Sequence, residues 1–115
     1  MNQYLLFRSN GVIHGIKIKY VQGTGSDFEG EKVSASECFF GEKEVERHFI
    51  QIKDRVLSVS QVLDIVNILE SYKVPSFFRS TPISEVAMIK NDIVVLLDVE
   101  KILDKCFKKG ERYGQ

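Results

Sequence analysis

The sequence predicts a mainly β domain that ends in an α-helix. Short segments rich in β-branched and aromatic residues recur along the 115-residue chain, and turn signals separate them. Near the C-terminus the apolar residues change from strand spacing to helical spacing directly after Asp98. Short strands between regular turns are typical of a barrel or sandwich rather than of β-α-β units.

The N-terminal segment predicts a β-hairpin. Asn10-Gly11 suits a type I′ turn, because both central residues of that turn need a positive φ. The turn joins residues 3–8 to residues 12–21. After Gly15, apolar and polar residues alternate as Ile-Lys-Ile-Lys-Tyr, which predicts a half-buried strand with its lysines in solvent.

The central segment, residues 22–47, has a weaker signal. Glycines and charges interrupt it, which predicts a flexible connection with one short strand over residues 32–40. Gly23-Thr-Gly25 is not a phosphate loop, because no Gly-Lys-Ser/Thr follows it. Phe39 and Phe40 need burial, so the segment is not simply disordered.

Two further strands follow, over residues 48–52 and 56–65, around a turn at residues 53–55. Residues 62–70 fit strand spacing and helical spacing equally well, so both structures stay open there. Pro75 then favours extended backbone at Val74 and closes the segment.

The last third predicts a hairpin and a helix. Two apolar runs flank Asn91-Asp92, a pair typical of a tight turn. The second run, residues 93–97, is rich in β-branched residues and predicts a strand that is buried on both faces. Asp98 occupies the expected N-cap of the helix. The residues that follow it at helical spacing are Val99, Ile102, Leu103 and Cys106.

Composition limits the classes of partner and compartment. Lys+Arg and Asp+Glu are 16 each, so the formal net charge is zero, which argues against a nucleic acid or an acidic membrane as partner. The N-terminus has no signal-peptide layout, and no apolar run approaches membrane-spanning length. We therefore expect a cytoplasmic domain over residues 1–108, with a polar tail at 109–115.

The cysteines and histidines show no metal-binding spacing. Cys38 and Cys106 form no C-x-x-C pair, and the chain has two histidines. We expect two free thiols in a reducing cytoplasm, with a single disulfide as the open alternative.

Catalytic constellations are also missing from the sequence. Neither His14 nor His48 is placed beside a nucleophile with an orienting acid. Residues 42–47 alternate glutamates with other residues, which favours a solvated, charge-mixed face over a carboxylate pair. We expect a protein that is not an enzyme and carries no cofactor.

Three blocks of the chain resemble CheW-like domains, the coupling proteins of bacterial chemotaxis. The opening hairpin follows the pattern yLxFxlxgexyGIxixxVqEI at Tyr4, Leu6, Phe7, Gly15, Ile16, Ile18, Val21 and Gln22. Residues 59–65 resemble the segment VseVldI, and residues 86–103 resemble the closing segment gvAxlddxlvlLLDleklL. The blocks occur in family order.

The resemblance implies two interleaved SH3-like β-barrels with a C-terminal helix. It also implies an adaptor without catalysis, which links the cytoplasmic tip of a chemoreceptor to the regulatory domain of the CheA histidine kinase. Val21 and Gln22 match receptor-facing positions of the family. Val59 and Val62 match positions that line the same groove, although filling of the barrel interior explains these two valines equally well.

The chain also departs from the family pattern. Gly23 stands where the family has Glu, and residues 23–47 lack the central segment that supplies strands and a receptor-contacting arginine. The strand over residues 56–59 looks clipped, so the second barrel is expected to be incomplete. We hypothesise that a homodimer covers the open edge by pairing or exchanging strands.

Two other classes of function stay open. One is an SH3-like protein-binding module that serves another bacterial signalling pathway and no longer couples receptor to kinase. The other is a small-molecule-binding or enzymatic domain, which would need a pocket with convergent polar groups. The sequence offers no candidate cluster for the second.

Overall fold

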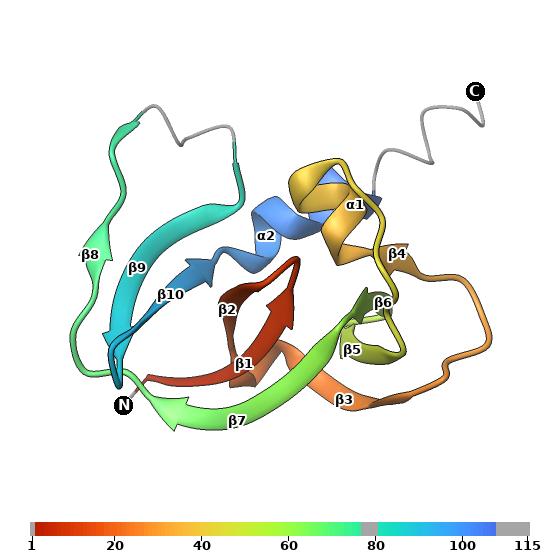
Figure 1. Ribbon diagram of the computed structural model, residues 1–115, viewed down its shortest axis with the longest axis horizontal. Helices are drawn as coiled ribbons and strands as arrows, with labels where there is room; N and C mark the ends of the chain where they lie inside the picture. The colour runs from red at the N-terminus through yellow and green to blue at the C-terminus, as the bar shows by residue number, and fades with distance from the viewer. Residues whose placement is uncertain (1, 77–80, 108–115) are drawn as a thin grey trace.

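The computed structural model describes residues 2–76 and 81–107. The expected domain boundary at residue 108 and the tail at 109–115 lie outside these residues. The described chain forms a six-stranded and a four-stranded sheet with short helices (Figure 1). This mainly β architecture confirms the predicted fold class.

The six-stranded sheet has the order β7-β1-β2-β10-β9-β8. Its strands are β1 (Gln3–Ser9), β2 (Val12–Lys17), β7 (Gln61–Asn67), β8 (Tyr72–Lys73), β9 (Ile83–Ile89) and β10 (Asp92–Leu97). The four-stranded sheet has the order β3-β5-β6-β4. Its strands are β3 (Val21–Ser26), β4 (Val33–Ser34), β5 (His48–Ile52) and β6 (Arg55–Val59).

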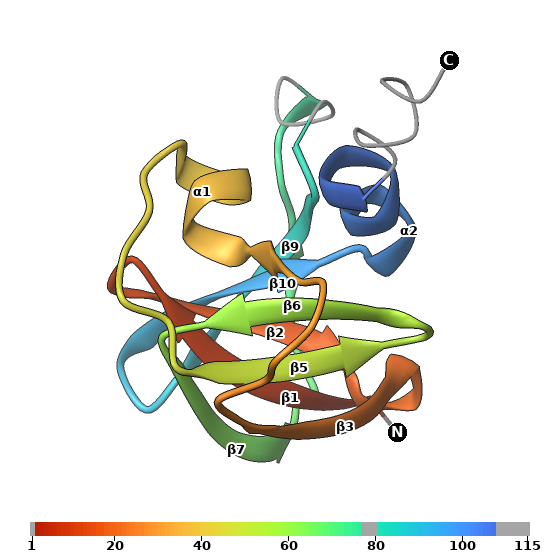
Figure 2. The same cartoon turned by 90° about the vertical axis from the view of Figure 1, so that its right-hand side faces the viewer.

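The helical elements are short. They are the 3-10 turn η1 (Ile18–Tyr20), α1 (Ala35–Phe40), α2 (Val99–Ile102) and the π-helical turn η3 (Leu103–Phe107). Helices α1 and α2 lie on the same side of the sheets (Figure 2).

The first hairpin forms as predicted. Asn10 has φ 53° and Gly11 has φ 77°, as a type I′ turn requires. β2 then pairs with β10 in parallel, and Leu96 lies opposite Gly15. A Cβ at Gly15 would lie 3.0 Å from Leu96 Cδ2, so the missing side chain lets Leu96 pack closely against β2.

The strand predicted over residues 12–21 ends earlier, at Lys17. The chain then turns through η1 and enters the other sheet as β3. This turn packs Ile18, Tyr20 and Val21 against one core. A continued strand would have kept these side chains on the first sheet, so burial between the sheets overrides the local alternation.

The second hairpin turns one residue earlier than predicted. Lys90 and Asn91 have φ 49° and 70°, and Asp92 pairs with Ile89. The two central residues are therefore Lys90-Asn91 rather than Asn91-Asp92. The prediction that the following strand is buried on both faces is wrong at its start, since Ile93 is 65% exposed.

Two apolar cores lie on opposite faces of the six-stranded sheet. Leu5 and Phe7 of β1 point into the first core, which the four-stranded sheet and the helices also line. Tyr4 and Leu6 point into the second core, within the six-stranded sheet itself. β1 is therefore buried on both faces, as expected for a strand shared by two barrels.

The predicted strand over residues 56–65 divides at Ser60. Its first part is β6 in one sheet, and its second part is β7 in the other. Ser60 donates twice to the Arg8 carbonyl, from its backbone nitrogen at 3.1 Å and from its hydroxyl at 2.7 Å. The ambiguity over residues 62–70 is resolved in favour of a strand over Gln61–Asn67.

The central segment is more ordered than predicted. Instead of a flexible connection with one strand over residues 32–40, it contains β3, β4 and α1. The Ser34 side chain caps α1 by accepting from the Glu37 nitrogen at 3.1 Å. Gly41, at φ 77°, ends the helix in the left-handed region. Ser34 and Glu37 also have the spacing of a capping box, a signal that the glycines and charges around it obscured.

Candidate protein-contact surface

Val21 and Gln22 lie at the start of β3, on the free edge of the four-stranded sheet. Side chains on this strand alternate between half-buried and exposed. Val21 packs against the first core, whereas Gln22 points to solvent. Gln51 on β5 donates to Gln22 Oε1 at 3.5 Å. Gln22 is therefore accessible to a partner, and Val21 only in part.

Val59 and Val62 flank the crossing from β6 to β7. Val59 is 0% exposed and belongs to the first core. Val62 is half-buried against the same core and pairs with Phe7. Val59 therefore fills the interior of the fold, whereas part of the Val62 side chain is exposed to solvent.

Val21 and Val59 lie beside opposite ends of β5. Val21 pairs with Ile52 at the end of β5, whereas Val59 pairs with His48 at its beginning. A strand rises about 3.3 Å per residue, so these positions are about 13 Å apart along β5 alone. In the four-stranded sheet, β5 lies between β3, which carries Val21 and Gln22, and β6, which carries Val59, so a groove shared by all four residues stays a prediction.

Exposed apolar side chains on β7 were not predicted. Ile65 is 55% exposed, and Leu69, which follows the strand, is 91% exposed. Ile65 pairs with Leu5, which in turn pairs with Ile16, so the three form one row across the sheet. Leu5 and Ile16 are covered by the first core, whereas Ile65 lies on the free edge. Alternation predicts the strand, but only the sheet order shows which residue is left uncovered.

Gly23 has no steric reason to be glycine. A Cβ built on it meets no atom within 4 Å, and its φ is not in the left-handed region. A Glu at this position, as in the family pattern, would therefore fit the backbone without strain.

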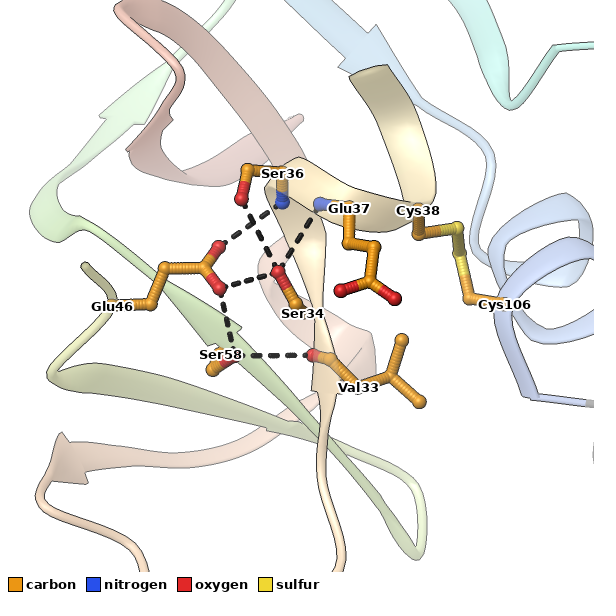
Figure 3. The surroundings of a disulfide bond; sticks show 8 residues. All are labelled: Val33, Ser34, Ser36, Glu37, Cys38, Glu46, Ser58 and Cys106. Carbon is orange, nitrogen blue, oxygen red and sulfur yellow. Dashed lines mark hydrogen bonds between the residues drawn. A yellow bond between two sulfur atoms is a disulfide. The ribbon is translucent and has the colours of Figure 1, made fainter. Parts of the chain in front are cut away.

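Glu46 forms a polar cluster beneath α1 (Figure 3). Its carboxylate accepts from the Ser34 hydroxyl, from the Ser36 nitrogen at 3.0 Å and from the Ser58 hydroxyl at 3.2 Å. The predicted solvated face is therefore wrong for Glu46. The cluster ties α1 to β6, and its hydroxyls are engaged in hydrogen bonds rather than directed toward a substrate.

His14 is buried among aromatic rings. Its ring stacks on Phe7 at 5.0 Å with an interplanar angle of 13°, and it contacts Phe39 at 5.4 Å and Phe40 at 5.9 Å. Burial lowers the pKa of His14 to about 4, only partly opposed by a hydrogen bond from the ring to the Val12 backbone, which raises the pKa. His14 is therefore neutral at pH 7 and forms part of the core.

The two cysteines are not free thiols. Cys38 on α1 and Cys106 on η3 form a disulfide, with their Cα atoms 5.8 Å apart (Figure 3). The bond joins residues separated by 68 positions. The expectation of free thiols is wrong because the fold packs α1 beside the C-terminal turn, a proximity that the spacing of the cysteines does not reveal.

A cleft of about 310 Å³ lies at the start of α2. Its acidic groups already have partners within the protein. Asp98 caps α2, Glu100 forms an ion pair with Lys53 at 2.9 Å, and Glu85 accepts from Ser71. Burial, and then the Glu85 charge, raise the pKa of Tyr4, which also lines the cleft. Each of these three carboxylates is therefore engaged by another group of the protein.

Among the described residues, no group of three or more His, Cys, Asp or Glu side chains is placed to hold a metal ion. Over residues 2–76 and 81–107, no helix has the length and apolar character needed to cross a membrane.

Comparison with known proteins identifies the fold. No family model matches the sequence, and no curated protein matches it. Solved structures do match, among them the scaffolding protein TtCheW from Thermoanaerobacter tengcongensis. That structure superposes with a TM-score of 0.69 at 12% sequence identity, covering 85% of this chain and 84% of TtCheW. The chain therefore has a CheW-like fold.

Proposed function

We propose that this chain is a non-catalytic adaptor of bacterial chemotaxis signal transduction. It would act in the cytoplasm and couple the cytoplasmic tip of a chemoreceptor to the regulatory domain of a CheA-type histidine kinase. The observation that supports this proposal is the match to a CheW scaffolding protein at a TM-score of 0.69 over 85% of the chain. Neither a nucleic acid nor membrane insertion is part of the proposed role.

The proposed contact surface combines the residues expected from the family with the exposed side chains of the structure. Gln22 and the exposed part of Val21 contribute the start of β3. Val62 and Ile65 contribute β7, where Ile65 is the most exposed apolar side chain. Val59 supports this surface from the core. An apolar side chain at a free edge gains most when a partner buries it, so Ile65 is the strongest candidate for an energetic contribution.

The test is a calorimetric titration of this protein into the regulatory domain of the kinase from its own host, and separately into the receptor hairpin tip. We expect saturable binding with a Kd on the order of micromolar, or about −8 kcal/mol. Ile65→Glu should weaken binding to one of the two partners at least tenfold. The matched control is Ile93→Glu, on a strand of the same sheet, where the side chain is 65% exposed.

Equal binding by Ile65→Glu and wild type would remove β7 from the contact surface. Absence of binding to both partners, from protein with a cooperative unfolding transition, would overturn the adaptor proposal.

The alternative function is a repurposed SH3-like binding module in another bacterial signalling pathway. Gly23 favours it, because the site has room for the Glu of the family pattern and lacks it. The substitution Gly23→Glu separates the two functions. The informative result is that wild type fails to bind both the kinase domain and the receptor tip while Gly23→Glu binds one of them. That result would mean that the glycine at position 23 removed the coupling function.

We also propose that a free sheet edge pairs with a second copy of the chain. β7 is seven residues long and lies at the edge of its sheet in the part of the chain that the structure describes. Asp64 is its sole charged residue, and long edges with few charges readily pair. Light scattering over a range of concentrations should show dimers. A monomer mass that does not change with concentration would rule this out.

A further inference from the structure

We propose that the Cys38–Cys106 disulfide is a reversible redox latch. In the oxidised state it holds the C-terminal helical segment, residues 99–107, against α1. Reduction by a dithiol of the thioredoxin-like class releases the last turn of that segment. The two sulfur atoms join elements that are 68 residues apart in the chain (Figure 3).

The first half of the C-terminal helical segment has anchors of its own. Asp98 caps it by accepting from the Lys101 nitrogen at 3.2 Å. Val99 is 4% exposed and Ile102 is 0% exposed, so both are buried in the first core. These contacts do not involve the disulfide, so we expect α2 to stay in place when the bond opens.

The second half is joined to α1 by the disulfide. Cys106 is the most buried residue of η3, at 8% exposure. Leu103 and Phe107 pack against the core only in part. The Arg55 guanidinium lies 5.8 Å from the centre of the Phe107 ring, which adds a weak cation–π contact. Without the covalent bond, η3 loses its one disulfide link to α1, while its non-covalent contacts remain.

The exposure of the two cysteines defines the order of the exchange. Cys38 is half-buried and Cys106 is buried, so a thiolate of the dithiol reaches the Cys38 sulfur first. Attack forms a mixed disulfide at Cys38, breaks the Cys38–Cys106 bond and releases the Cys106 thiolate, which takes up a proton. The second thiol of the dithiol then attacks its own bound sulfur and releases the Cys38 thiolate, which is protonated in turn. Two electrons and two protons pass to the protein, and the dithiol becomes a disulfide.

The compartment supplies the reason for reversibility. Disulfides in a reducing cytoplasm are usually transient, catalytic or redox-sensing. This step rests on the proposed function, which places the chain in the cytoplasm. The latch itself rests on the bond and its surroundings, and its test uses no chemotaxis partner, so the latch and the adaptor role fail separately.

The experiment compares full-length protein oxidised in air with the same protein treated with dithiothreitol under native conditions. Free thiols are trapped with N-ethylmaleimide and detected by intact mass, and hydrogen–deuterium exchange is followed in both states. We expect no labelled thiol in the oxidised protein and labelling of both cysteines after reduction. Amides of residues 103–107 should then exchange on the order of tenfold faster, while β1 and β2 stay unchanged.

The variants Cys38→Ser and Cys106→Ser are the matched controls. Each should exchange like reduced wild type, with or without dithiothreitol. If either variant fails to fold, the comparison of oxidised and reduced wild type still tests the latch. Three results would overturn the latch: labelled thiols in the air-oxidised protein, a bond that dithiothreitol opens only after unfolding, or equal exchange of residues 103–107 in both states.

Discussion

The β1–β2–β10 centre and the central segment at residues 22–47 are held together by different forces. In the centre, side chains alternate between two apolar cores, as Leu5 and Leu6 do on neighbouring positions. In the central segment, α1 is held by the Glu46 cluster and by the bond from Cys38. The first region is stabilised mainly by burial, whereas the second adds hydrogen bonds and a covalent cross-link to the burial of Ala35 and Phe39.

This difference predicts different responses to conditions. Burial of apolar surface changes little with redox state or with moderate changes of pH. A disulfide responds to redox state, because reduction removes the cross-link. The centre should therefore form the constant scaffold of the domain, and α1 with its neighbours the part that conditions can alter.

Leu96→Ala tests the contribution of apolar burial to the β1–β2–β10 centre and, at the upper end of its range, has the largest expected effect of the series. Leu96 is 1% exposed and packs against Gly15 in the second core. Truncation removes buried methyl groups and leaves a cavity, which should cost about 2–5 kcal/mol of unfolding free energy. Urea denaturation followed by circular dichroism measures the loss.

The control for Leu96→Ala is Ile93→Ala on the same strand. Ile93 is 65% exposed, so its truncation should change stability by less than about 0.5 kcal/mol. If Leu96→Ala unfolds at the same urea concentration as wild type, β10 does not form the centre of the fold.

Cys38→Ser tests how much the disulfide contributes to the stability of the protein. The bond closes a loop with a sequence separation of 68, and the chain-entropy account gives such a loop about 4 kcal/mol. Denaturation of the variant and of wild type without reductant measures the difference. With a reductant present the two proteins should unfold together, because neither then has the cross-link. A persistent gap under reducing conditions would mean that the serine itself damages the packing of α1.

The sequence predicts the centre well because its signals are local. Asn10-Gly11 and the Asp98 cap each act within a few residues, and the structure confirms both. The α1 helix was missed although Ser34 and Glu37 carry its capping spacing, because no long apolar periodicity supports them.

The candidate site was harder to predict from the sequence than the fold. Glu46 accepts from serines on three segments of the fold, and only the tertiary structure brings these together. The same holds for the disulfide between Cys38 and Cys106. Ile65 is exposed because of the sheet order, which the alternation of residues along β7 does not contain.

His14 connects the two regions, since it lies on β2 and contacts Phe39 and Phe40 of α1. Its pKa falls from 6.5 to about 4 in the folded protein, because burial disfavours the charged ring. Between these pH values the unfolded chain binds the proton and the folded chain does not, so stability is lost as pH falls from about 6.5 to 4. The full shift corresponds to about 3 kcal/mol.

The His14 prediction is measured as the change in unfolding free energy between pH 7 and pH 4.5, for wild type and His14→Phe. Phe fits the aromatic surroundings and has no proton to bind. Carboxylates titrate in both proteins, so the difference between them isolates His14. Parallel pH profiles would show that the ring is not held neutral by α1 and the core.

Glu46→Gln should have the smallest effect of the series. It tests only the hydrogen bonds that hold α1 in the central segment. The amide keeps one acceptor oxygen, but its nitrogen cannot accept from Ser34, Ser36 or Ser58, so at least one of these donors loses its partner. The expected cost is about 1–3 kcal/mol of unfolding free energy, measured in urea at pH 7. Glu42→Gln is the matched control, because Glu42 is exposed and should lose less than about 0.5 kcal/mol. If the two variants unfold alike, the disulfide and the aromatic contacts of His14 hold α1, and the carboxylate does not.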